Sequence, residues 1–133
     1  MKEGKFDPNR HVNYVHHVGA VYSISHIETS DTSPHSLITL KIETEYRGRR
    51  HEPMLVPVIA WNAALGGPQF VDLLKQSGVK RGDTLHIEGR NTFRFKKSRN
   101  YAGVTANRIG IVRSLGGESF VEWLQEDKAE NVD

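Results

Sequence analysis

The chain has 133 residues, with 18 Lys/Arg, 16 Asp/Glu and no cysteine. This length predicts one domain with a single core, and the lack of cysteine excludes thiol nucleophiles, Fe–S clusters and Cys-ligated zinc. Residues 1–117 hold 17 Lys/Arg and 10 Asp/Glu, a balance of +7, whereas residues 118–133 hold one Lys and six acids, a balance of −5. A basic body attracts polyanions, although ordinary surface charge explains this balance equally well.

No membrane or export signal is evident. There is no run of 18 apolar residues, and the start, MKEGKFDPNR, lacks the apolar stretch of a signal peptide. We therefore expect a soluble cytoplasmic protein.

The first half of the chain predicts three strands. Residues 1–11 are polar and predict a flexible arm. Residues 12–27 are rich in β-branched and aromatic residues around Gly19, which in a strand marks a bulge or bend. Residues 37–46 alternate between apolar and polar side chains, as in a half-buried strand, and residues 54–62 form a third, apolar strand.

One internal segment predicts a helix. Pro68 suits its first turn, apolar residues recur at helical spacing between residues 70 and 74, and Gly78 suits a left-handed C-cap. Residues 81–95 and 101–112 then predict two strands around a polar turn at residues 97–100.

This order of elements is that of the OB-fold, which often binds oligonucleotides or oligosaccharides. Gly19 and Gly89 fall where strands bend to close a small barrel. We predict an all-β, five-stranded OB-fold Greek-key barrel with one helix between the third and fourth strands and a short C-terminal helix. A five-stranded barrel of another type is the alternative.

The segment RNTFRFKKSRNYAGV, residues 90–104, mixes Phe93, Phe95 and Tyr101 with cations. One interpretation is a solvated hairpin whose Phe93 and Phe95, two residues apart, point into the core. The other is a nucleic-acid surface, where cations contact phosphates and rings stack on bases. The five cations are Arg90, Arg94, Lys96, Lys97 and Arg99.

Four segments resemble, in order and spacing, the bacterial single-stranded DNA-binding protein family. They are NYVHHVGAV (13–21), LITLKIETEY (37–46), VPVIAWNAA (56–64) and VKRGDTLHIEGR (79–90). The resemblance covers about residues 12–113 and implies an OB-fold domain that binds single-stranded DNA.

The resemblance also implies roles for particular residues. It places base stacking at Tyr46 and Trp61. Two further aromatic positions of the family carry Lys96 and Leu55 here, so we expect Phe93 or Phe95 to compensate at the hairpin. Phosphate contacts are expected from Arg47, Arg49, Arg50, Arg94, Lys96, Lys97 and Arg99.

Metal, cofactor and catalytic sites are not predicted. His16 and His17 are adjacent in a strand and point to opposite faces, and the other histidines show no spacing that builds a shared site. Glu88 has no second carboxylate at a suggestive spacing, and we interpret it as an ion-pair partner of Arg90.

Residues 114–133 predict an acidic tail. Ser119 begins a capping-box pattern, and Phe120 and Trp123 fall on one helical face. A helix this short is marginal in water, so we expect residues 119–126 to dock as a helix on the barrel or on a neighbouring subunit. The alternative is a disordered tail that recruits partners and competes with DNA for the basic groove.

The sequence thus predicts a non-enzymatic protein that binds single-stranded DNA without sequence preference. It would protect or organise that DNA in replication, recombination or DNA transfer, as a homotetramer or homodimer, with replication or recombination proteins as further partners. Two alternatives stay open: a primosomal replication adaptor of the same fold, and an OB-fold module that contacts only proteins.

Overall fold

Six strands and one helix make up the part of the chain that the computed structural model describes. This part comprises residues 12–28, 33–43, 52–63, 66–96 and 99–124, and for residues 93–96 and 99–102 the description covers the backbone only. The strands are β1 (Val15–Ile27), β2 (His35–Ile42), β3 (Met54–Trp61), β4 (Thr84–Lys96), β5 (Arg99–Leu115) and β6 (Glu118–Trp123). The helix α1 (Phe70–Ser77) lies between β3 and β4, as the sequence predicts.

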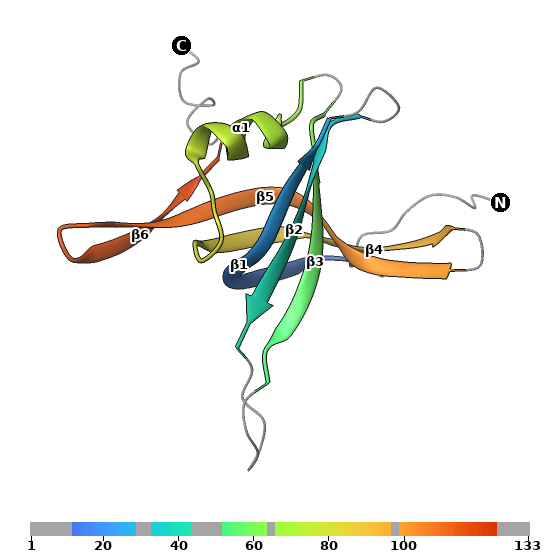
Figure 1. Ribbon diagram of the computed structural model, residues 1–133, viewed down its shortest axis with the longest axis horizontal. Coiled ribbons are helices and arrows are strands. Elements are labelled where there is room, and N and C mark those ends of the chain that lie inside the picture. Colours follow the sequence, from blue (N-terminus) through green and yellow to red (C-terminus); the bar gives the residue numbers. More distant parts are fainter. Residues whose placement is uncertain (1–11, 29–32, 44–51, 64–65, 97–98, 125–133) are drawn as a thin grey trace.

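The strands form one sheet that closes on itself. Their order is β3-β2-β1-β4-β5-β6, and each neighbouring pair is antiparallel. A short parallel pairing of Val58 and Ile59 in β3 with Val104 and Thr105 in β5 closes the barrel. This is the predicted all-β OB-fold topology with one strand added. Figure 1 shows β5 running from its hairpin with β4 to its hairpin with β6 at the opposite end.

Alternating side chains build the core. In β2, Ser36, Ile38 and Leu40 are buried and Leu37 between them is exposed, which confirms the predicted period of two. Leu85 and Ile87 of β4 and Ile109 and Ile111 of β5 join the same cluster.

Close backbone approach explains both of the predicted glycines. A Cβ at Gly89 would lie 2.0 Å from the carbonyl oxygen of Thr105, at a register shift between Glu88 and Gly89. A Cβ at Gly19 would lie 2.7 Å from the carbonyl oxygen of Lys41. The barrel therefore tolerates no side chain at either position without a backbone shift.

The helix covers one end of the barrel with Phe70, Val71 and Leu74, all buried. It ends at Gly78, whose φ of 74° is the predicted left-handed C-cap. It begins at Phe70 with Gln69 as the N-cap, so Pro68 lies just before the helix and not in its first turn as predicted. No helix in the described ranges is long and apolar enough to cross a membrane.

The predicted C-terminal helix over residues 119–126 is wrong. Residues 118–123 form β6, which pairs antiparallel with β5, and residues 125 and 126 lie outside the described residues. Gly116 and Gly117 have φ values of 63° and 86°, so they make a two-residue turn that connects Leu115 directly to its partner Glu118.

Pairing with β5 also explains why residues 118–123 form a strand and not a helix. The strand gives its backbone groups a hydrogen-bonded ladder along β5, whereas an eight-residue helix is marginal in water. Its side chains alternate, with Val121 and Trp123 half-buried and Phe120 and Glu122 exposed. The tail segment does dock on the barrel, as expected, but as a sixth strand.

Candidate nucleic-acid interface

The outward face of β2 and β3 is largely apolar and accessible. Leu37 is 44% exposed and Leu55 is 49% exposed, and both lie in strands whose alternate residues are buried. In the OB-fold, the face of strands two and three is the surface that binds oligonucleotides. The outward residues of this face, in two cross-strand rows, are His35, Leu37, Thr39 and Lys41, and Trp61, Ile59, Pro57 and Leu55.

Trp61 lies at one end of this face, opposite His35. The two residues are register partners, and their ring centroids are 4.6 Å apart at an interplanar angle of 43°. The His35 Nδ1 donates to the carbonyl oxygen of Ser33 at 2.9 Å, because that carbonyl can only accept, and this bond orients the imidazole. Trp61 is half-buried, so it lies neither in the barrel core nor free in solvent.

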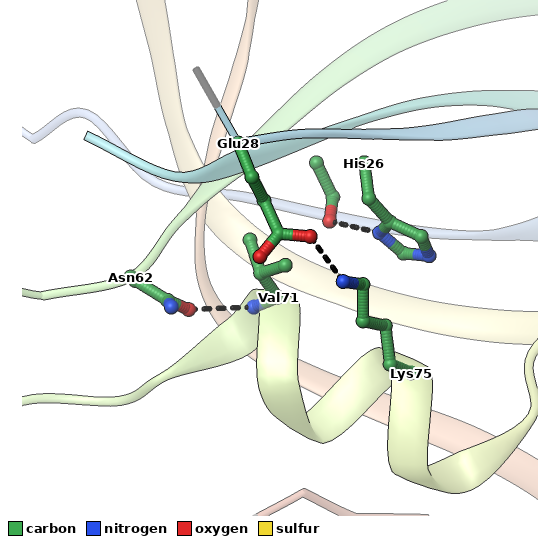
Figure 2. A network of polar contacts seen from close by, with 6 residues as sticks. His26, Glu28, Asn62, Val71 and Lys75 are labelled. Carbon is green, nitrogen blue, oxygen red and sulfur yellow. Dashed lines mark hydrogen bonds and ion pairs between the residues drawn. The ribbon is translucent and has the colours of Figure 1, made fainter. Parts of the chain in front are cut away.

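The residue after Trp61 anchors this end of β3 to the helix. The Val71 backbone N–H donates to Asn62 Oδ1 at 2.7 Å, which caps a helix that has no side-chain cap of its own (Figure 2). The Asn62 N–H in turn donates to the carbonyl oxygen of Pro34 at 3.0 Å. The backbone next to Trp61 is therefore held from both the helix side and the β2 side.

A second set of contacts links the helix to the end of β1, and β1 to β2. Lys75 pairs with Glu28, and His26 Nδ1 lies 2.7 Å from the hydroxyl of the fully buried Ser36 (Figure 2). Burial lowers the pKa of His26 below 6.5, and the nearby Lys75 charge lowers it further, while Glu28 opposes both. Burial and the Lys75 ammonium group therefore both favour the neutral form of the imidazole.

The β4–β5 hairpin brings several predicted residues onto one extended arm. Its backbone register pairs Arg94 with Tyr101, Phe95 with Asn100 and Lys96 with Arg99. β5 begins at Arg99, so Arg99 and Asn100 belong to the strand and not to the predicted turn. The arm extends from the barrel in Figure 1.

Of the twelve predicted site residues, Trp61 is the one whose side chain the structure describes. Phe93, Arg94, Phe95, Lys96, Arg99 and Tyr101 are placed by their backbone in the hairpin. Tyr46, Arg47, Arg49, Arg50 and Lys97 lie outside the described residues.

The β4–β5 register changes the predicted partners of Glu88 and Arg90. Glu88 accepts from Arg108 Nη1 at 3.1 and 3.2 Å, so its partner is not Arg90 as the sequence suggested. Glu88 and Arg108 are cross-strand partners, whereas Arg90 lies beyond the bulge and donates to Asn107 Oδ1 at 3.1 Å. Arg108 is therefore the cross-strand ion-pair partner of Glu88.

Sequence reasoning missed His35, Leu37 and Ile59 on this face. Ile59 could have been identified from the sequence, because it lies two residues before Trp61 and side chains two apart in a strand share a face. His35 and Leu37 become neighbours of Trp61 and Ile59 only through the β2–β3 register, which spacing within one strand does not reveal.

Comparison with known proteins identifies the fold. No family model and no curated protein matches the sequence. The structure is similar to a solved Plasmodium falciparum SSB complex with ssDNA, with a TM-score of 0.60 and 12% sequence identity, covering 94% of this chain and 100% of that chain.

A second similar structure is that of a deletion variant of the single-stranded DNA binding protein from Thermus aquaticus. Its TM-score is 0.61 and its identity 16%, and the match covers 82% of this chain and 54% of that chain. At such low identities the likeness establishes that this chain has the OB-fold of these proteins, and it carries no residue assignments.

Proposed function

We propose that this protein binds single-stranded DNA without sequence preference. The observation that carries the proposal is the accessible apolar face of β2 and β3, with Trp61 at its end, in a fold that uses this face for oligonucleotides. The SSB complex with ssDNA has the same fold. Single strands offer unstacked bases to such a surface, whereas duplex DNA does not.

The chemistry of the face suits binding to any sequence. Every base has a π-face, and stacking on an aromatic side chain contributes about 1–3 kcal/mol per base. Leu37 and Ile59 extend the apolar surface next to Trp61, and Leu55 lies at the other end of the face. We assign base stacking to Trp61 and, outside the described residues, to Tyr46.

Lys41 is the one Lys or Arg among the outward residues listed for the described part of the face, and residues outside that part add more charge. We propose that Arg94, Lys96, Lys97 and Arg99 of the β4–β5 arm, and Arg47, Arg49 and Arg50 after β2, bind phosphates. Phe93, Phe95 and Tyr101 are candidates for a further stack on the arm.

We extend the proposal to the domain, assembly and cellular role of the protein. We propose that residues 12–113 form the DNA-binding unit, that the protein assembles as a homo-oligomer, and that it protects or organises DNA in the cytoplasm during replication, recombination or DNA transfer. Binding by stacking and charge needs neither a catalytic group nor a cofactor, so we do not propose an enzyme.

Fluorescence anisotropy with labelled oligo-dT, repeated across a range of salt concentrations, tests the proposal. We expect sub-micromolar binding that weakens as salt rises, because phosphate contacts displace counterions. A duplex of the same length is the control and should bind more weakly. No binding of oligo-dT at low salt would refute the proposal and favour a module that contacts only proteins.

A further inference from the structure

Two histidines from distant parts of the sequence meet on the outer face of β1 and β4. His16 Nε2 lies 3.1 Å from His86 Nδ1, and the ring centroids are 5.2 Å apart. The residues are 70 positions apart in the chain, so their meeting depends entirely on the β1–β4 register. His16 is exposed and His86 is half-buried, which leaves the pair accessible from solvent.

From this geometry we propose that His16 and His86 form a binding site for a late first-row divalent transition metal. Metal–imidazole bonds are about 2.0–2.1 Å long, so two nitrogens on one ion lie about 2.9 Å apart at a right angle and about 3.4 Å apart at a tetrahedral angle. The observed separation of 3.1 Å falls between these values. Imidazole nitrogens suit Zn²⁺, Ni²⁺ and Cu²⁺.

The strand pairing brings the two histidines together, and a contact with Trp123 positions one of them. His16 and His86 lie on adjacent hydrogen-bonded strands, opposite Glu88 and Val18 respectively. The His86 ring meets Trp123 of β6 at 5.8 Å and 70°, an edge-to-face contact that fixes its orientation. Ligands fixed by neighbouring side chains lose little entropy on binding a metal.

The charges around the pair permit a cation. Arg108 lies nearby, with its guanidinium 3.9 Å from the Trp123 ring centroid, but both Glu88 carboxylate oxygens accept from it. The positive charge is therefore compensated on the same face. Among the described residues no group of three or more potential metal ligands gathers, so the remaining coordination positions are left to water.

Such a site would link β1 to β4 in the folded state only. The unfolded chain does not hold the two imidazoles together, so an ion stabilises the fold by mass action. With Ni²⁺ or Zn²⁺ at 100 times its dissociation constant, the melting temperature should rise by about 10 °C. This inference does not depend on DNA binding.

Titration of the full chain with Cu²⁺, Ni²⁺ and Zn²⁺ tests the site, with Cu²⁺ electron paramagnetic resonance as a direct readout. We expect two nitrogen ligands on Cu²⁺ in the natural protein, and an affinity for all three ions that falls roughly tenfold or more in His16→Asn, because the second ligand then no longer binds intramolecularly. His86→Asn should behave in the same way.

His17→Asn is the matched control. His17 is the next residue of the same strand and is half-buried on the opposite face, so its removal should leave the affinity unchanged. Equal affinity of the natural protein and His16→Asn would overturn the proposal and leave the pair as a hydrogen bond. An equal loss in His17→Asn would also overturn it, because the ion would then bind elsewhere.

Discussion

Gly110 is the position at which the docking of β6 can be measured. It is buried in β5 beneath Trp123, its register partner. A Cβ built at Gly110 would lie 2.5 Å from Val121 Cγ1, 2.9 Å from Trp123 Cε3 and 3.1 Å from Trp123 Cδ2. Gly110→Ala therefore forces β6 side chains away from β5.

The cost follows from overpacking. An extra methyl group in a well-packed site destabilises a protein by about 1–3 kcal/mol, and we expect a loss of this size in the free energy of unfolding. Part of it arises because the displaced Trp123 ring leaves the Arg108 guanidinium, a contact that contributes about 0.5–2 kcal/mol. Ser114→Ala, on the same strand and exposed, is the control and should change stability by less than about 0.5 kcal/mol.

A double-mutant cycle with truncation after Gly117 isolates the cause. Truncation removes β6 and with it the Arg113–Glu122 ion pair, so it should itself destabilise the barrel by about 1–3 kcal/mol. The truncated chain has no β6, so the new methyl group of Gly110→Ala has no β6 side chain to clash with. Gly110→Ala should then cost about zero, within the additivity error of roughly 0.5 kcal/mol.

Urea unfolding of the four proteins measures the cycle. If Gly110→Ala costs the same in the full and truncated chains, the clash with β6 is not its source and the reasoning fails. If truncation leaves the free energy of unfolding unchanged, β6 does not stabilise the barrel and the tail is free in solution.

Three further outcomes are expected. Trp61→Ala should weaken oligo-dT binding by about 1–3 kcal/mol with an unchanged salt slope, because a stack releases no counterions; an unfolded variant would instead show that Trp61 is needed for the fold. Replacing Lys96 and Lys97 with Ala should reduce the slope of log affinity against log salt by about 0.7 per lost phosphate contact, and an unchanged slope would exclude both residues from phosphate binding. The folded-state pKa of His26 lies below its ordinary value of 6.5, so the unfolded chain takes up a proton first as the pH falls. The stability that neutral His26 contributes should be fully present above about pH 6.5 and lost as the pH falls through the lower folded-state pKa. In urea unfolding between pH 5 and 8, the free energy of unfolding should therefore fall less at acidic pH in His26→Gln than in the natural protein. The same pH dependence in both proteins would contradict this.

Local patterns determined most of the barrel in advance. The alternation in residues 37–42 predicted which side chains of β2 are buried, because a strand turns successive side chains to opposite faces. Gly78 predicted the end of α1, because a left-handed C-cap favours glycine. The order of strands and helix then limited the topology to a small barrel.

The C-terminal segment shows where a local pattern is ambiguous. Residues 118–123 carry both a capping-box spacing and a strand alternation, and the Gly116–Gly117 turn favours the strand. Such a glycine pair between two alternating segments is typical of a β-hairpin turn. Backbone hydrogen bonding to β5 favours the strand over the helix, and β5 is available for this pairing only in the folded barrel.

Cross-strand partners were decided by the tertiary structure alone. A period of two assigns each side chain to a face, but it does not say which residue of the next strand lies opposite. The contacts of Trp61 with His35, of Glu88 with Arg108 and of His16 with His86 all depend on register. Register in turn is set by bulges such as that at Gly89 and by closure of β3 on β5, which no single segment of the sequence contains.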